Sequence, residues 1–239
     1  MSRCSLDDFL APISARLGHE EVPEAPTQGK QVKRPVRVTD GLSHDALVDM
    51  FVEQAQAIRV SVVRTTAEGA ADAVAKIVSE ARAADAAEGA TVQVGPAVYS
   101  AQEKLAELGI PAVLGEDAVR WDVEAGHDAM LQACNQARFG VTYAAGAIAE
   151  TGTIVQPMTA DCGRSVSLLP LAHIVLIDAS TMKPTMREAL DELDAARKAG
   201  GKLASQVCFI SGPSVTSDIE LVRVEGVHGP MYVYYVVVE

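Results

Sequence analysis

The chain has few cysteines, and they are far apart. Cys4, Cys134, Cys162 and Cys208 show no C-x-x-C spacing, so neither a disulfide framework nor a zinc site is expected from them. A ferredoxin-like run of cysteine ligands is also missing. We therefore expect no cofactor on this chain, and any electrons in its chemistry must be carried by another protein.

Long apolar runs are missing as well. No stretch approaches the ~20 apolar residues that a membrane helix needs. Asp7 and Asp8 stand where a signal peptide requires an uninterrupted apolar core. We therefore expect a cytoplasmic protein. Catalytic triad, Walker and G-x-G-x-x-G motifs are not found either.

Positive charge is scarce, because the formal net charge is −12. Such a field repels nucleic acid and anionic membranes, so neither is an expected partner. The same field opposes an anionic ligand, and a site for a small acid therefore needs local cations. The candidates for that role are Arg138, Arg164, His173, Lys202 and His228.

Aromatic residues make up only 4% of the chain, whereas hydrophobic residues make up 49%. A core built from Ala, Val, Leu and Ile is typical of parallel strands covered by helices on both faces. Helical and strand patterns alternate from Ser43 onward, which predicts a parallel sheet with right-handed crossovers. The expected helices are 43–58, 66–85 and 98–108, and the expected strands are 59–64, 91–95 and 111–114.

The two ends of the chain differ from this alternation. Residues 1–42 are expected to form an N-terminal helix over 5–17 followed by an extended arm, and 43–239 the α/β domain. In the second half, consecutive apolar segments without long helices predict antiparallel additions to the sheet. The expected helices are one near 127–137, one at 184–199 and a short one opened by a capping box at Ser217 and Glu220. The expected strands are 173–178, 207–210 and 231–238. Short apolar runs are found at 139–148, 152–156 and 166–169.

Turns rich in Gly, Ser and Thr follow apolar runs throughout this second half. Glycine lets backbone N–H groups approach a ligand, and hydroxyl groups add donors, so such turns are typical of anion sites in α/β proteins. The first of these turns is Glu150, Thr151, Gly152 and Thr153. A carboxylate at a dry strand end would have a raised pKa and suit acid–base or nucleophilic catalysis. The alternative is that Glu150 is an ordinary turn residue.

The later turns supply the other candidate residues. Hydroxyl groups and free N–H groups after the strand at 207–210 would bind a phosphate or carboxylate, or would only cap the following helix. The residues concerned are Ser211, Gly212, Ser214 and Thr216. Arg164 is the best single partner for a carboxylate because its guanidinium can bind two oxygens, although a structural salt bridge fits equally well.

Three further residues are candidates for acid, base or thiol chemistry. His228, in a turn before the last strand, is a candidate acid or base near neutral pH. His173 begins an apolar strand and is favoured as a hydrogen-bonded core residue. Cys162, in an expected loop, is the only cysteine worth testing as a reactive thiol.

These motifs together resemble the lactate-utilisation protein C family, whose unit is the LUD domain. The resemblance covers about residues 40–239, and four motifs in one order carry it. They are Ala149 to Thr153, Gly163 to Pro170 with His173, Ser211 to Glu220, and Gly226 to Pro230.

The resemblance implies a three-layer α/β sandwich similar to ribose-5-phosphate isomerase, glucosamine-phosphate deaminase and CoA-transferases. It also implies a place in a three-protein system that oxidises L-lactate to pyruvate, with Fe–S clusters on a partner protein. Two hypotheses follow. The chain is either a non-redox component that binds a small carboxylate or docks the Fe–S partners, or an independent enzyme acting on a small acid, sugar phosphate or acyl-CoA.

Overall fold

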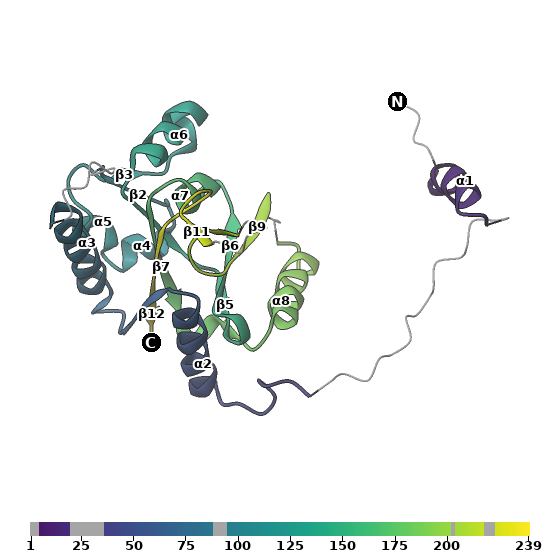
Figure 1. Ribbon diagram of the computed structural model, residues 1–239, viewed down its shortest axis with the longest axis horizontal. Helices are drawn as coiled ribbons and strands as arrows, with labels where there is room; N and C mark the ends of the chain where they lie inside the picture. Colours follow the sequence, from purple (N-terminus) through teal and green to yellow (C-terminus); the bar gives the residue numbers. More distant parts are fainter. Residues whose placement is uncertain (1–4, 20–35, 88–94, 202–203, 218–222) are drawn as a thin grey trace. The chain divides into compact units, whose positions relative to one another are not determined.

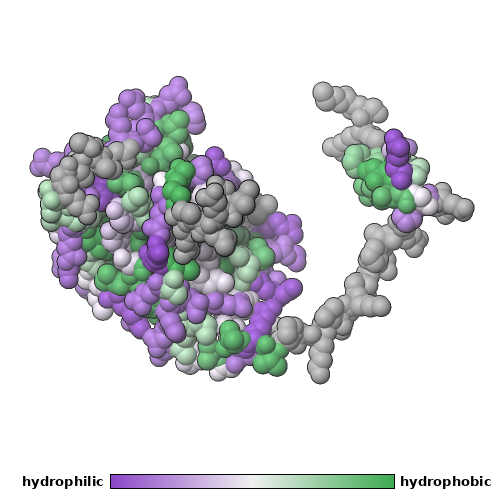
Figure 2. Space-filling view, viewed as in Figure 1, coloured by the Kyte–Doolittle hydropathy of each residue, from purple (hydrophilic) through white to green (hydrophobic). Residues whose placement is uncertain are grey.

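The computed structural model describes residues 5–19, 36–87, 95–201, 204–217 and 223–239. The chain divides into two units, Met1–Arg37 and Val38–Glu239. The first unit holds the expected N-terminal helix, α1 (Leu6–Arg16), which begins where the Ser5 hydroxyl accepts a hydrogen bond from the backbone N–H of Asp8. The apolar side chains of α1 are exposed, Leu6 and Phe9 among them, and Figure 2 shows apolar atoms gathered on this helix.

The second unit is built on a six-stranded parallel sheet (Figure 1). Its spatial order is β1-β12-β7-β4-β2-β3. The two longest strands, β7 and β12, lie side by side in the middle and are almost entirely buried, as expected of strands covered on both faces. The strands are β1 (Ser61–Thr65), β2 (Ala97–Tyr99), β3 (Val119–Arg120), β4 (Phe139–Tyr143), β7 (Ala172–Asp178) and β12 (Tyr232–Val238).

Antiparallel strands are added in the C-terminal half, as predicted. A smaller sheet has the order β8-β5-β6-β9, and β10 pairs with β11 in a hairpin. In the described residues β9 pairs with β6 alone, so β9 is an edge strand. Strand β9 contains no charged residue. The bounds are β5 (Gly146–Ile148), β6 (Thr153–Met158), β8 (Met182–Lys183), β9 (Gln206–Ile210), β10 (Val215–Ser217) and β11 (Arg223–Glu225).

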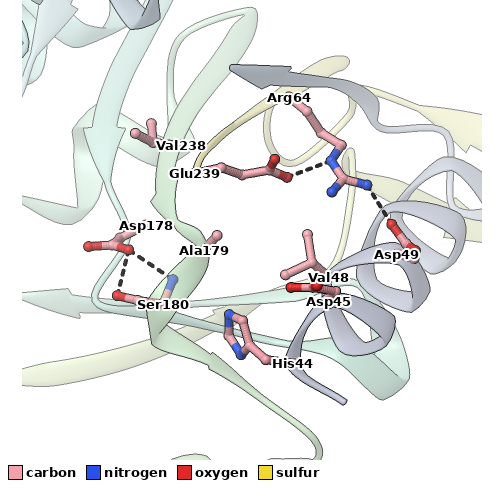
Figure 3. Close-up of a pocket in the computed structure, with 10 residues that line it drawn as sticks. All are labelled: His44, Asp45, Val48, Asp49, Arg64, Asp178, Ala179, Ser180, Val238 and Glu239. Atoms are coloured by element: carbon pink, nitrogen blue, oxygen red, sulfur yellow. Dashed lines mark hydrogen bonds and ion pairs between the residues drawn. The ribbon is translucent and has the colours of Figure 1, made fainter. Parts of the chain in front are cut away.

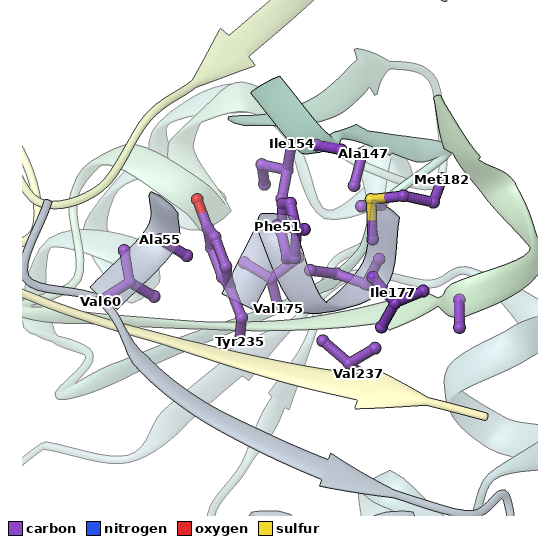
Figure 4. Packing of buried hydrophobic residues seen from close by; sticks show 14 of the residues in the cluster. Phe51, Ala55, Val60, Ala147, Ile154, Val175, Ile177, Met182, Tyr235 and Val237 are labelled. Carbon is purple, nitrogen blue, oxygen red and sulfur yellow. The ribbon is translucent and has the colours of Figure 1, made fainter. Parts of the chain in front are cut away.

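Helices cover both faces of the main sheet. One buried cluster joins α3 and α5 to one face, and another joins α2 and the smaller sheet to the opposite face, which gives the expected layered α/β fold. In the second cluster the Phe51 ring stacks on Tyr235 with centroids 5.5 Å apart (Figure 4). The helices are α2 (His44–Ala57), α3 (Ala70–Ala87), α4 (Glu103–Glu107), α5 (Ile110–Val113), α6 (His127–Gln136), α7 (Arg164–Leu168) and α8 (Met186–Lys198), with 3₁₀ turns η1 (Val123–Ala125), η2 (Ala149–Thr151) and η3 (Ala179–Thr181).

Two predictions of extended structure are wrong. Residues 111–114 fall largely in helix α5, where Gly109 adopts a φ of 69° before the helix and Pro111 lies in its first turn, a position that proline favours. The apolar run at 166–169 falls largely in helix α7. Short apolar runs do not separate buried helix from strand by periodicity.

Several boundaries also differ from the prediction. The expected helix at 98–108 is replaced by the end of β2, a turn and the short helix α4. The expected strand at 91–95 lies almost wholly outside the described residues, and so does the region after Ser217 in which a helix was expected. Ser217 itself ends strand β10. Within the described residues, no helix has the length and apolar character needed to cross a bilayer.

One buried ion pair fastens α3 to the main sheet, and its removal gives a first prediction. Arg138, only 3% exposed, donates two hydrogen bonds of 2.6 and 2.8 Å to Asp85. Asp85→Asn is expected to lower the free energy of unfolding by about 3 kcal/mol at pH 7, because the guanidinium loses its counter-charge. Urea denaturation measures this change.

The pH dependence of the same variant follows from the pKa of Asp85. The hydrogen bond from Arg138 lowers this pKa below its ordinary value of 3.8. The stabilisation is therefore complete above that value and is lost as the pH falls through the folded-state pKa, so wild type and Asp85→Asn should converge in acid. Asp194→Asn, on the exposed surface of α8, is the matched control and should change stability little. Equal effects of the two variants would contradict the assignment.

Candidate functional site

The connections of the main sheet diverge between β2 and β4. The chain passes from β2 to its neighbour β3 on one side, and from β4 to its neighbour β7 on the other. In parallel α/β sheets such a divergence opens a crevice at the carboxyl ends of the two strands, and ligands bind there. The crevice lies after Tyr99 in β2 and after Tyr143 in β4.

The side chain of Gln102 forms the floor of this crevice. Its amide donates a hydrogen bond of 2.9 Å to the carbonyl of Tyr143 and accepts one of 3.0 Å from the N–H of the same residue. The hydroxyl of Ser100 donates a third bond of 2.6 Å to the Gln102 carbonyl oxygen. The amide thus pairs with β4 as a further strand residue would, and it fixes the separation of the two strand ends.

A hollow of about 330 Å³ lies beside this crevice, on the β3 side of β2, and is lined from the ends of β2 and β3 and from α4 and α5. Arg120, at the end of β3, is exposed, and among the described residues its guanidinium makes one hydrogen bond, a long one of 3.5 Å to the carbonyl of Ala101. In the described part of the chain no carboxylate pairs with it. The hollow is lined by Tyr99, Ser100, Ala101, Gln102, Glu103, Leu105, Ala106, Pro111 and Arg120.

The chain's only tryptophan is next to Arg120 and holds a neighbouring loop. The Trp121 indole N–H donates a hydrogen bond of 3.0 Å to the carbonyl of Ala160. A Cβ added at Gly163 would lie 2.1 Å from the indole ring, so only glycine permits this approach. The N–H of Ala101 bonds the carbonyl of Asp161 at 2.6 Å. Residues 159–163 are thereby held beside the crevice.

A buried polar network lies close to the crevice floor. Thr142 contacts the Nε2 atom of His173 at 2.9 Å and the side-chain oxygen of Gln156 at 3.0 Å. The Gln156 amide reaches the carbonyl of Tyr143 at 3.3 Å and the sulfur of Cys162 at 3.4 Å. The network therefore joins the core of the sheet to the same strand end that Gln102 holds.

Burial disfavours the charged forms of the two ionisable members of this network, His173 and Cys162. It lowers the pKa of His173 to about 3, so the imidazole is neutral at physiological pH. Burial, with the nearby Asp161 charge, raises the pKa of the Cys162 thiol to about 12. His173 is thus the core residue that the sequence favours, and Cys162 is not the reactive thiol considered above.

A second hollow, of about 500 Å³, lies at the carboxyl ends of β1, β7 and β12 (Figure 3). Among the described residues that line it, Arg64 is the one arginine or lysine, and it is bound by Glu239 and Asp49 at 2.5 Å each. The hydrogen bond from Glu239, and then that from Asp49, raises the pKa of Arg64. Asp45 and Asp178 add negative charge to the lining. The larger hollow therefore disfavours an anionic ligand, whereas the smaller one presents an unpaired cation.

The first predicted turn lies at neither hollow. Glu150 is exposed, so the dry surroundings expected for its carboxylate are not found. The hydroxyl of Thr153, which is buried, contacts those of Thr151 at 2.6 Å and Ser211 at 2.7 Å. The structure thus brings two of the predicted turns together through a chain of three hydroxyl groups.

Both turns pack against the C-terminal end of α2. A Cβ added at Gly152 would lie 2.5 Å from the backbone nitrogen of Ala55, and one at Gly212 would lie 2.8 Å from the carbonyl oxygen of Ile58. The C-terminal end of a helix carries partial negative charge. The glycines therefore serve close packing, and their surroundings do not favour an anion.

The remaining predicted residues are dispersed. Ser214 accepts a hydrogen bond of 3.3 Å from the N–H of the exposed His228, and Thr216 is exposed in β10. Arg164 contacts Gln206 at 3.4 Å, at the opposite end of β9 from Ser211, about 16 Å away at the usual strand rise. Lys202 lies outside the described residues, and Arg138 is bound to Asp85.

The crevice residues were missed from the sequence for a local reason. The expected helix at 98–108 extended across Ser100 and Gln102, so the turn between β2 and α4 was not recognised. Arg120 has no glycine or hydroxyl motif around it. The signal available was an Arg-Trp pair following a short apolar segment, which alone has little specificity.

The protein thus has a layered α/β fold whose strand connections diverge between β2 and β4, with a hollow beside that point. A family model described as the LUD domain matches residues 48–238, which is most of the chain. The protein therefore belongs to the LUD domain family.

Bacterial relatives match over most or nearly all of the chain. Lactate utilization protein C of Bacillus licheniformis is 32% identical, covering 98% of this chain and 95% of that protein. Lactate utilization protein C of Bacillus subtilis is 29% identical over 97% and 95% of the two chains. Uncharacterized protein YkgG of Escherichia coli is 39% identical over 69% and 72%.

A solved structure has the same fold. The crystal structure of a DUF162 family protein from Deinococcus radiodurans matches with a TM-score of 0.55 and 24% sequence identity. The match covers 83% of this chain and 99% of that one. At this identity the likeness concerns the fold alone.

The close packing at Gly152 gives a second prediction. Gly152→Ala should be markedly destabilising, because φ is +60° there and a Cβ would meet the α2 backbone. Gly41 has a φ of +81° with nothing within 4 Å, so Gly41→Ala isolates the cost of the backbone conformation, about 1 kcal/mol. Thermal denaturation should give Gly152→Ala a free energy of unfolding at least about 2 kcal/mol lower than that of Gly41→Ala. Equal losses would mean that the turn does not pack as described.

Proposed function

We propose that this protein is a cytoplasmic, non-redox component of a system that oxidises L-lactate to pyruvate. It binds a small carboxylate in the hollow that Arg120 lines, beside the crevice between β2 and β4, and it carries no cofactor of its own. Fe–S clusters belong to a partner protein with which it assembles. The lactate part of this proposal is supported by the relatives named Lactate utilization protein C, which match nearly the whole chain at about 30% identity.

The observation that carries the ligand proposal is the unpaired Arg120. A guanidinium can bind both oxygens of a carboxylate with charge-assisted hydrogen bonds. Leu105, Ala106 and Pro111 supply an apolar wall for a short alkyl group. A ligand as small as lactate makes few other contacts, so we expect a dissociation constant near 1 mM, about −4 kcal/mol.

The residues predicted from the sequence as a ligand site have a different role in this proposal. Glu150, Thr151, Ser211 and Arg164 are exposed and line neither of the two hollows described above. We assign them to the surface that contacts the Fe–S partner. An independent enzyme with Glu150 as base or nucleophile has less support, because its carboxylate is in solvent and neither of the two hollows described above includes it.

Arg120→Ala tests the ligand site. Binding of L-lactate and pyruvate can be followed by the fluorescence of the single tryptophan, Trp121, and by calorimetry. We expect Arg120→Ala to weaken binding at least tenfold, since Arg120 is the one cation among the described residues that line the hollow. Arg164→Ala is the matched control, because it removes an exposed arginine at the far end of β9, and it should leave affinity unchanged.

The reverse result would relocate the site. If Arg164→Ala abolished binding and Arg120→Ala did not, the carboxylate would bind near α7 and not in this hollow. If neither lactate nor pyruvate bound to the wild-type protein at 20 mM, the ligand proposal would be rejected.

The partner proposal is tested separately. The protein is isolated with its native assembly from cells grown on lactate, and iron and acid-labile sulfide are measured in each component. We expect both in a co-purifying partner and neither in this chain. Glu150→Lys should weaken the assembly, whereas Glu107→Lys, on α4, should not. Stable isolation of this chain alone from such cells would contradict the proposal.

A further inference from the structure

We infer that the hollow lined by Arg120 selects 2-hydroxy acids over 2-oxo acids, and that Glu103 is the residue that makes this distinction. The inference rests on the proposed function, since it concerns the same site. It adds which of the two acids in the lactate–pyruvate couple is the ligand of this chain.

Glu103 lies where it can contact the ligand. It is the first residue of α4, its side chain is exposed, and it lines the same hollow as Arg120. In the described part of the chain its carboxylate has no hydrogen bond or ion pair. The next two charged residues of this helix differ, because Lys104 and Glu107 are bound to each other at 2.7 Å.

Two polar side chains of the hollow, Ser100 and Gln102, are already engaged. The Ser100 hydroxyl donates to Gln102, and both ends of the Gln102 amide are bound to Tyr143. Arg120 is the group available for the carboxylate of the ligand. The Tyr99 ring packs against the apolar cluster of α3 and α5, and Glu103 is the other charged side chain of the lining, placed to contact the substituent on C2.

An ionised carboxylate accepts hydrogen bonds and donates none. The hydroxyl of a 2-hydroxy acid can donate to Glu103 while the acid group is held by Arg120. A 2-oxo acid offers only an acceptor at the same place, so its oxygen would face the Glu103 oxygens with no proton between them. Sites that bind a ligand hydroxyl reject analogues that lack it. Because Glu103 is exposed, we expect a modest selectivity of about tenfold.

The test compares Glu103→Gln with Glu107→Gln. Both changes replace a carboxylate by an amide on the exposed surface of α4, but only residue 103 lines the hollow. Dissociation constants for L-lactate and pyruvate are measured for each variant by calorimetry, with Trp121 fluorescence as a second readout. The 2-hydroxybutyrate and 2-oxobutyrate pair repeats the comparison with a longer alkyl group.

Wild type and Glu107→Gln should bind the hydroxy acid about tenfold more tightly than the oxo acid. In Glu103→Gln the ratio should fall to about one, because the amide N–H can donate to the oxo oxygen. Equal binding of both acids by wild type, or a ratio that survives Glu103→Gln, would overturn the inference while leaving the carboxylate site in place. Failure of both acids to bind, or binding unaffected by Arg120→Ala, would instead reject the proposed site and the inference with it.

Discussion

The divergence of the strand connections at β2 and β4 is the constraint on which the site depends. Parallel strands need crossovers, and once neighbouring crossovers leave in opposite directions, no chain segment is left to fill the space between them. Gln102 then keeps the two strand ends at a fixed separation with its side-chain amide. The order of the strands thus creates the crevice, and the side chain of Gln102 bridges its two sides. The buried hydrogen-bond network of Thr142, Gln156 and His173 holds the end of β4 in place.

Charge decides which hollow of this sheet edge suits an acid. The protein carries a net charge of −12, so an anion approaches against an unfavourable field. In the larger hollow the only arginine is neutralised by Asp49 and Glu239. The smaller hollow has less room but an arginine without a counter-ion. Volume favours the larger hollow, whereas the unpaired guanidinium favours the smaller one for an acidic ligand.

Much of the fold was predictable from the sequence, and the site was less so. The helices α2, α3 and α8 follow from apolar periodicity, and the buried strands β7 and β12 follow from longer continuous apolar runs, which are typical of strands covered on both faces. Helix α5 was mistaken for a strand because a run of four apolar residues is too short to show helical or strand periodicity. The hydroxyl chain from Thr151 to Ser211 shows that two predicted turns do meet. Their glycines, however, are explained by contact with α2, and the residues of the crevice come from segments with no distinctive motif.

The edge strand β9 has a consequence for the handling of the protein. Natural sheets usually protect an open edge with a charge, a proline or a bulge, but Gln206 to Ile210 contains none of these and is rich in residues that favour strands. Such a segment is a template for pairing with other chains whenever its surroundings loosen. Aggregation at high concentration or during heating should therefore begin at this strand, and a lysine introduced at Gln206 would be the first change to try for solubility.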